Sequence, residues 1–533
     1  LEPGGIDDED TAINFGAGFS WGITDELELT LQIQRVDSSS PAKQGDFISE
    51  RTEDNEAAIE IKQKLWGNAE DTQSLSGVVS ASWGTRGFLF TRGGEETEIN
   101  NRDIFVSLQL PYTATVNERW QFTISPTVAF FKDESAVFFH STPDDDDSSF
   151  GTTFGFTGAV SYAISPRFAI WGDAFIPITG KNSINRDSGE PDTAIVYNAG
   201  IRYLFNPRLA LDLYASNAQG SINPLALTGD RDFVSFGTNL IFMPDFIAAN
   251  RRQPDRFSPS KQNDDPPTPI VNSGFAFFDG GTLDSGQFLF NVQGGSQGIL
   301  TSLRYGFLKD FEGGIYLDYV SGEADESEQG FSGKIRFFNQ AENDPITASL
   351  AVTLGLTNQP FANFDDNNRN AFDRRGLEKE VPFAIPGADN ADESQEFIFT
   401  ASVPLNYQFD NDAAIWFTPI IGYVQRLGTE IAGFNVGGSF PINRELSVLG
   451  EVGANFTGEG NGFIGDELED LIPWIVGVRW QPLSLFGLEP SPNNTNPQLE
   501  LYFTNRVGSS TWHQLRVRDQ NKTAVGFGLI LPF

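Results

Sequence analysis

The residues that could do chemistry in this chain are charged side chains set into segments that alternate between apolar and polar residues. In "ELELTLQIQ" (26–34), Leu27 and Leu29 alternate with Glu28 and Thr30. A period of two is typical of a β-strand with one apolar and one polar face. The charged residues on such polar faces are Glu28, Glu60, Lys62, Lys64, Asp173, Arg202, Asp212, Arg304, Asp318, Lys334, Arg336, Glu451, Arg479 and Glu500. We predict that they line a water-filled pore, because charges buried dry and unpaired would be costly. The alternative is that they form paired structural ladders.

Signals for catalysis are weak. The chain has only 2 His, His140 and His513, so any Ser-His-Asp arrangement must use one of them. Ser510 precedes His513 by three positions, but no nucleophile-elbow sequence occurs. We therefore expect no catalytic residue and no enzymatic activity.

Signals for a metal or cofactor are equally weak. Asp366, Asn368 and Asn370 have the spacing at which a calcium-binding EF-hand loop begins, but Ala371 and Leu377 stand where that loop needs Gly and Glu. The residues 460–465, "GNGFIG", match a dinucleotide-binding pattern without the strand and helix that it requires. No metal site and no cofactor are expected, with weak Ca²⁺ binding by the acidic loops as the alternative.

Composition narrows the class of protein. With 72 acidic and 35 basic residues, the formal charge is −37, which argues against nucleic acid as a partner. The chain has no Cys, so disulfide scaffolds and thiolate sites are excluded. No apolar run reaches the roughly 18 residues of a transmembrane helix. The first residues, "LEPGGIDDED", show no signal-peptide pattern, which predicts either a removed signal or a cytosolic protein.

Strand-like segments recur along the whole chain, and their connections alternate between short and long. Short "GITDE" and "TVNE" alternate with long 37–53 and 133–148, and the long loops are acidic. Transmembrane β-barrels sort their loops in this way, with tight turns at one end and long loops at the other. We predict an all-β fold, a transmembrane antiparallel β-barrel. A soluble β-solenoid or a pair of sandwiches is the alternative.

Two halves of the chain resemble each other. "NPRLALDLYASN" (206–217) returns as "NPQLELYFTN" (496–505), and "DIFVSLQLPY" (103–112) returns as "EFIFTASVPL" (396–405). Similarity of this kind indicates an internal duplication. We expect a first β-barrel repeat module, a Pro-rich linker and a second module, at 1–245, 246–284 and 285–533.

Strand counting gives about eleven strands in the first half and about twelve in the second. One barrel of about 22–24 strands and two tandem barrels of about 12 strands are both compatible with this count. The rarity of two barrels in one chain favours the single barrel. The linker is read as a solvated tether, with a lumen-filling element as the alternative.

The chain ends on "VGFGLILPF", in which Val525, Phe527, Leu529, Leu531 and Phe533 occupy alternate positions. In this ending the chain resembles the bacterial outer-membrane β-barrel proteins of the porin-like class, whose last strand carries the signal for their assembly machinery. The resemblance implies the outer membrane of a Gram-negative-type bacterium as location. It also implies partners: membrane lipid, the barrel-assembly machinery and other copies of the chain in a homo-oligomer.

The resemblance further implies passive diffusion of small hydrophilic solutes or ions, and the acidic loops predict a mouth that modestly favours cations. Two alternatives stay open. One is a non-transporting surface protein that binds cations, envelope glycans or a protein. The other is a barrel sheath around a periplasmic electron-transfer or secretion partner.

Overall fold

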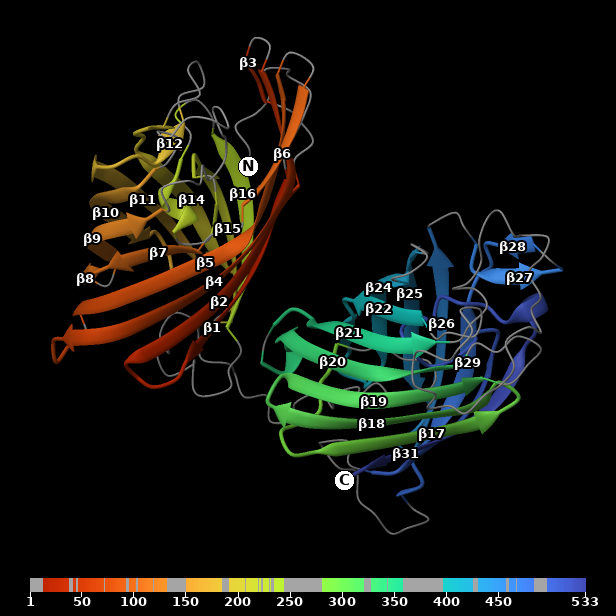
Figure 1. Cartoon of the computed structure of the whole chain (residues 1–533). Coiled ribbons are helices and arrows are strands. Elements are labelled where there is room, and N and C mark those ends of the chain that lie inside the picture. The colour runs from red at the N-terminus through yellow and green to blue at the C-terminus, as the bar shows by residue number, and fades with distance from the viewer. Residues whose placement is uncertain are drawn as a thin grey trace. The chain divides into compact units, whose positions relative to one another are not determined.

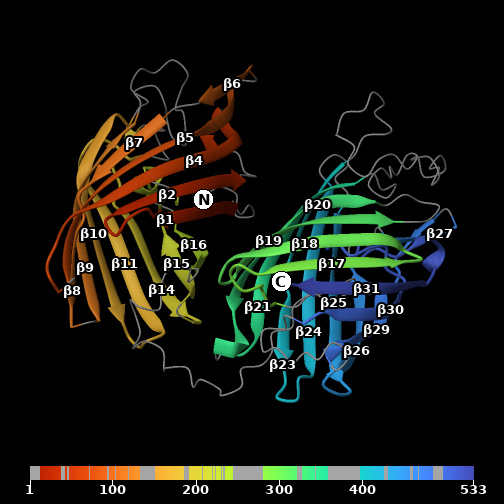
Figure 2. The same cartoon turned by 90° about the horizontal axis from the view of Figure 1, so that it is seen from below.

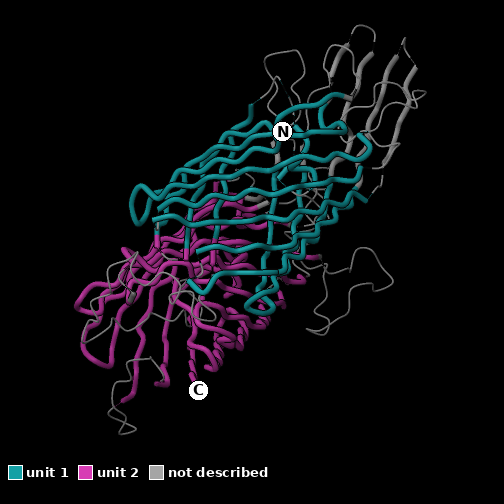
Figure 3. Tube along the Cα trace, turned by 90° about the vertical axis from the view of Figure 1, so that its left-hand side faces the viewer, with its two compact units in different colours: residues 1–205, 209–241 teal, residues 206–208, 242–533 magenta. Residues whose placement is uncertain are grey.

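A computed structural model describes residues 13–37, 42–44, 47–70, 72–92, 95–101, 104–117, 119–131, 150–184, 191–206, 208–218, 220–221, 224–229, 231, 234–243, 280–320, 327–342, 344–357, 396–424, 430–456, 460–465, 467–483 and 496–533. The chain divides into two compact units, coloured separately in Figure 3. The first comprises residues 1–205 and 209–241, and the second comprises 206–208 and 242–533. Most of the linker, the EF-hand-like segment around Asp366 and His140 lie outside the described residues.

The second unit is a closed antiparallel barrel of 12 strands, counting β22 and β23 as one interrupted strand (Figure 1). Each strand pairs with the next, and β31 returns to pair with β17. The strands are β17 (Phe288–Gly295), β18 (Gly298–Leu308), β19 (Phe311–Val320), β20 (Glu328–Phe338), β21 (Thr347–Thr357), β22 (Glu396–Ser402), β23 (Leu405–Gln408), β24 (Ala414–Val424), β25 (Glu430–Pro441), β26 (Leu446–Asn455), β29 (Trp474–Trp480), β30 (Gln498–Thr504) and β31 (Ala524–Pro532). A small hairpin, β27 (Gly462–Ile464) with β28 (Glu467–Glu469), lies between β26 and β29.

The first unit is one large antiparallel sheet, whose curvature is visible in Figure 2. Its path runs β1-β2-β4-β5-β7-β9-β10-β11-β14-β15-β16. The strands are β1 (Ile13–Gly22), β2 (Leu27–Asp37), β3 (Ala42–Gln44), β4 (Phe47–Gly67), β5 (Gln73–Arg92), β6 (Glu95–Asn101), β7 (Ile104–Gln109), β8 (Tyr112–Val116), β9 (Trp120–Phe130), β10 (Thr152–Ala163), β11 (Phe168–Thr179), β14 (Val196–Leu204), β15 (Leu209–Ser216) and β16 (Ser235–Phe242). A short hairpin, β12 (Ser183–Ile184) with β13 (Pro191–Asp192), lies between β11 and β14.

The all-β antiparallel barrel is confirmed, but the preference for one barrel of about 22–24 strands is wrong. The second unit closes on itself, because β17 pairs with β31 on one side and with β18 on the other. The alternative of tandem units therefore describes the chain. Sequence alternation reports which face a side chain takes, but it carries no information on which strand closes the ring.

The same device interrupts one strand in each unit. Pro111 separates β7 from β8, and Pro404 separates β22 from β23. Proline has no amide hydrogen to donate to a sheet, so the ladder breaks there. The carbonyls beside the break are still used: Ser76 N donates to Pro111 O at 3.0 Å and Ser349 N to Pro404 O at 3.1 Å.

Apolar side chains cover the outside of the second unit, while polar ones turn inward. On β24, Ile415 and Phe417 are exposed, whereas Trp416 and Thr418 are buried. Aromatic pairs mark the strand ends beside the short turns, such as Tyr305 with Phe288, whose ring centroids lie 4.4 Å apart. An apolar belt with aromatic rims is the exterior of a membrane-spanning barrel. Among the described residues, no helix has the length and apolar character to cross a membrane.

The closing segment forms β31, the strand that seals the second barrel. Val525, Phe527 and Leu529 are exposed on its outer face. Phe533 continues the ladder beyond the strand, because its N donates to Phe288 O at 2.9 Å and its O accepts from Phe288 N at 2.7 Å. The apolar ending thus lies between two hydrogen-bonded neighbours. Its role as an assembly signal stays a prediction.

Candidate functional site: the filled interiors of the two units

The predicted pore residues of the second unit are mostly buried, and each is paired with a charged side chain of the barrel wall or of the loop inside it. Arg479 donates to Glu500 at 2.8 Å, and Arg336 donates to Asp310 at 2.7 Å. Glu312 accepts from Arg304 Nε at 3.0 Å and lies 3.6 Å from Lys334 Nζ. Asp318 and Glu451 pair with a segment described below. The charges form ion pairs between neighbouring strands, as in the paired ladders of the alternative interpretation. Their role as pore-lining residues stays a prediction.

In the first unit the predicted residues are more exposed. Arg202 and Asp212 form a two-pronged ion pair at 2.7 Å, with 42% of the Arg202 side chain exposed. Asp173 accepts from Asn198 Nδ2 at 2.8 Å. Glu28 and Lys62 are register partners on β2 and β4, with Glu60 opposite Thr30. Lys64 is half-buried near the end of β4. The structure thus distributes the predicted set over two interiors rather than one.

The loop between β30 and β31 fills part of the second barrel. We call residues 505–523 the second lumen segment. Asp318 on β19 accepts from Ser509 N at 2.5 Å, Ser510 N at 2.8 Å and His513 Nδ1 at 2.9 Å. Ser510 Oγ donates to Glu328 on β20 at 2.8 Å. Both carboxylates belong to barrel strands, so they hold this loop against the inner wall.

A second ion pair joins the lumen segment to β26 of the same barrel. Arg506 Nη1 donates to Glu451 Oε1 at 2.5 Å, and both side chains are fully buried. Arg506 also donates to Asn435 at 3.2 Å, and Asn435 donates to Gln514 at 3.0 Å. Trp416 completes the group by donating its indole N–H to Glu451. Both carboxylate oxygens of Glu451 thus accept a hydrogen bond, which offsets part of the cost of burying the pair.

Apolar side chains complete the attachment. Trp512 and Leu515 are fully buried and pack against inward residues of the barrel wall, namely Ile398, Ile420 and Ile431. Within the described residues, the second lumen segment therefore combines an apolar contact with ion pairs.

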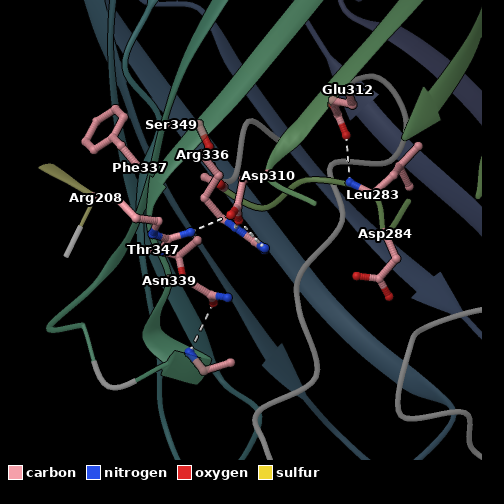
Figure 4. A network of polar contacts seen from close by, with 12 residues as sticks. Arg208, Leu283, Asp284, Asp310, Glu312, Arg336, Phe337, Asn339, Thr347 and Ser349 are labelled. Atoms are coloured by element: carbon pink, nitrogen blue, oxygen red, sulfur yellow. Dashed lines mark hydrogen bonds and ion pairs between the residues drawn. The ribbon is translucent and has the colours of Figure 1, made fainter. Parts of the chain in front are cut away.

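The end of the predicted linker also enters the second unit. Leu283 N donates to Glu312 Oε2 at 2.8 Å (Figure 4), and its side chain packs with Leu289 and Ile530. Gly280 N donates to Asn406 at 2.7 Å. Residues 280–283 are buried against the barrel rather than forming a solvated tether, and the part of the linker before residue 280 lies outside the described residues.

The first unit has an equivalent loop between β15 and β16. We call residues 217–231 the first lumen segment. Its Leu225 and Leu227 are buried in an apolar cluster with the inward residues Phe105, Ala129, Phe131, Phe150, Phe175 and Val196. A polar contact joins Ser221 N to Gln34 Oε1 at 2.9 Å. The contact of the first lumen segment with the wall is thus mainly apolar.

One asparagine fixes each lumen segment in the same manner. In the first unit, Asn182 Nδ2 donates to Leu227 O and Ala194 O, both at 2.9 Å, and its backbone O accepts from Gly229 N at 3.0 Å. In the second unit, Asn461 Nδ2 donates to Leu515 O at 2.6 Å and to Leu471 O at 2.9 Å. Asn461 O accepts from Val517 N at 2.9 Å.

Sequence reasoning missed these two asparagines. Asn182 lies two residues after Gly180 and Asn461 directly after Gly460, and both glycines have φ of 83°. A positive φ favours glycine. The available signal was "GNGFIG" itself, which is a turn that clamps the lumen segment rather than a nucleotide site.

The buried Ser510, His513 and Asp318 lie together at the inner wall of the second barrel. Ser510 Oγ donates to Glu328, and the His513 ring contacts Asp318 and Glu328 through its two nitrogens, at 2.9 and 3.5 Å. The expectation of no enzymatic activity stays a prediction. Among the described residues, no group of three His, Cys, Asp or Glu has the arrangement to hold a metal ion.

These observations define the class of protein. A closed antiparallel barrel with an apolar exterior satisfies every strand hydrogen bond internally, which is the condition for crossing a bilayer with strands. The chain is therefore an outer-membrane β-barrel protein, located in the outer membrane of a diderm bacterium.

Comparisons with known proteins add one family match. A family model described as "Putative MetA-pathway of phenol degradation" matches residues 96–221, which is less than half of the chain. A search of curated proteins finds no significant match.

Several solved outer-membrane structures align weakly. Salmonella typhi OmpF in complex with daunomycin is 9% identical over 88% of this chain and 100% of that chain, with a TM-score of 0.21. The siderophore receptor PirA from Pseudomonas aeruginosa is 8% identical over 98% and 77%, with a TM-score of 0.20. The alcaligin receptor FauA from Bordetella pertussis is 10% identical over 98% and 67%, with a TM-score of 0.19. At these scores a superposition does not establish a shared fold, and the class rests on the barrel itself.

Proposed function

We propose that this protein is an outer-membrane channel for the passive diffusion of small hydrophilic solutes or ions. The observation that carries the proposal is the inner wall of the second barrel, which carries ionised and amide side chains beside its apolar clusters. Such a wall favours water and polar solutes over lipid.

The second lumen segment limits this path. Because it is anchored to β19, β20 and β26, the open cross-section is smaller than that of an empty barrel, and only small solutes pass. The formal charge of −37 supports a mouth that modestly favours cations over anions. No cofactor and no catalytic step are part of the proposal. The proposed partners are lipid, the assembly machinery and other copies of the chain.

Planar-bilayer recording of the purified protein tests this function. We expect small, stable single-channel currents, with reversal potentials in a salt gradient that indicate cation preference. Arg506→Met, which removes an anchor of the second lumen segment, should raise the single-channel conductance. Leu350→Ala, on the exposed outer face of β21, is the matched control and should leave it unchanged. A tight seal without current for both the wild type and Arg506→Met would reject the channel.

A second candidate substrate class is favoured by the interior of the first unit. Its buried aromatic residues Phe105, Phe131, Phe150 and Phe175 fall within the residues matched by the phenol-degradation family model. An aromatic interior is suited to small aromatic compounds. Uptake into liposomes of phenol and of a sugar of similar size distinguishes aromatic from hydrophilic substrates. We expect Phe175→Ala to alter the uptake of phenol and to leave the uptake of the sugar unchanged.

The two other hypotheses have less support. A sheath around another protein needs the wide lumen of a single large barrel, whereas the second barrel holds its own lumen segment. If planar-bilayer recording shows no current, the hypothesis of a non-transporting surface protein is favoured.

A further inference from the structure

The first unit has two sheet edges that the second unit lacks. The path of its sheet ends at β1 on one side and at β16 on the other, and among the described residues no pairing joins them. In the second unit β18 corresponds to β1 and β31 corresponds to β16. The same number of strands separates the two members of each pair, and a lumen segment directly precedes both β16 and β31. There, β17 lies between them and pairs with both.

Strand direction shows what the open edges require. Each strand on the path pairs antiparallel with its neighbour, and the path of the first unit has eleven strands, so β1 and β16 run in the same direction. Direct closure would join two parallel strands. One added strand, antiparallel to both, would continue the alternation, as β17 does in the second unit. Bacterial barrels have even strand numbers for the same reason.

Exposure singles out the same place. All side chains from Phe15 to Gly22 on β1 are exposed, whichever face they take. On the equivalent β18, inward Leu300 is fully buried. Phe236 on β16 is 83% exposed, the highest value among the large apolar residues that are exposed. An unpaired edge of this kind is not stable in hydrocarbon, because its amide and carbonyl groups have no partner there.

We propose that the seam between β1 and β16 binds one extended strand of β17's pattern, antiparallel to both edges. The strand's chemistry follows from β17. Phe288, Phe290 and Val292 take its outer face, and Asn291 and Gln293 are buried on its inner face. The inner face of β17 also carries the buried Leu289, so the occupant is a segment of about eight residues with an apolar outer face and an inner face of one apolar and two amide side chains. This inference does not depend on the proposed transport function.

Disulfide trapping tests whether the edges pair directly. The chain has no Cys, so introduced pairs are the only thiols. Adjacent strands lie about 4.8 Å apart, and a disulfide needs Cα atoms within about 7 Å, so an intervening strand prevents the bond. We expect no disulfide in the full-length protein in lipid vesicles for Ala17→Cys combined with Phe236→Cys, Thr238→Cys or Leu240→Cys.

Matched pairs in the second unit calibrate the assay. Val292→Cys with Leu529→Cys should form a disulfide, since these residues are register partners. Thr301→Cys with Leu529→Cys should not, since Val292 lies between them.

Residue-resolved amide hydrogen exchange supplies the second measurement. A bound strand would protect the β1 amides on the free edge as strongly as those of β10, which is paired on both sides. Absent disulfides with protected β1 amides support the proposal. A disulfide in any of the three pairs would show direct closure and overturn it. Absent disulfides with rapidly exchanging β1 amides would show an open edge and overturn it as well.

Discussion

The two lumen segments occupy the same place in the strand order but fill their units by different means. The first buries Leu225 and Leu227 among aromatic side chains. The second buries Arg506 and His513 against carboxylates of the wall. The frame that holds them is nevertheless shared, because Asn182 and Asn461 make matching hydrogen bonds. The same arrangement of strands therefore supports one segment held mainly by apolar contacts and one held by apolar contacts together with ion pairs.

The matching hydrogen bonds include a second pair of asparagines, at the start of each lumen segment. Asn217 accepts from Tyr197 N at 2.7 Å, and Asn505 accepts from Trp474 N at 2.7 Å. Both residues end the stretch that suggested a duplication, 206–217 against 496–505. The difference between the units thus lies in the side chains through which each lumen segment contacts the wall. Substitutions of these side chains should affect one unit and not the other.

The largest effect is expected from Arg506→Met. It leaves Glu451 buried without its cation, which should destabilise the second barrel by about 3–5 kcal/mol. Urea unfolding in lipid vesicles measures the change, with exchange of the Ser509 and Ser510 amides as a local readout. Adding Glu451→Gln should recover much of the loss. If Arg506→Met alone is as stable as the wild type, the ion pair with Glu451 does not stabilise the second barrel.

Leu225→Ala should have the next largest effect, confined to the first unit. Removing a buried leucine side chain costs about 3 kcal/mol when the cavity stays open. The same unfolding assay measures it, and Leu240→Ala on the exposed face of β16 is the control. If both variants lose equal stability, the apolar cluster does not hold the first lumen segment.

Asn182→Ala and Asn461→Ala should have smaller and similar effects. Each leaves backbone groups without their side-chain partner, at about 1–3 kcal/mol for each buried group. Hydrogen exchange at Ala194 and Leu471, whose amides bond these side chains, reports each site separately. A marked difference between the two variants in the gain of exchange rate would show that the two asparagines do not play equivalent roles.

Much of this architecture could be predicted from local pattern. Alternation in segments such as 26–34 and 525–533 indicated strands, and the assignment of Glu451 and Arg479 to a polar face agrees with the low exposure of both side chains, 0% and 11%. The repeated stretch ending at Asn217 and Asn505 pointed to two similar halves. These features depend on neighbouring residues, so a single sequence contains them.

The lumen segments could not be predicted in this way. "STWHQLRVR" (510–518) has the polar composition of a surface loop, yet Trp512, His513 and Arg516 are fully buried. Their burial depends on Asp318, Glu328 and the carbonyl of Asn461, which are distant in sequence. The apolar Trp512 and Leu515 inside a long loop were the only local hint.

The sequence by itself determined that the chain forms antiparallel strands with an apolar and a polar face, because a strand alternates its side chains whatever it pairs with. Only the tertiary structure decided that β31 turns back to β17, that the polar faces enclose ion pairs, and that two loops fold inward. Closure and pairing join residues hundreds of positions apart, and their free energy exists only once both partners are in place.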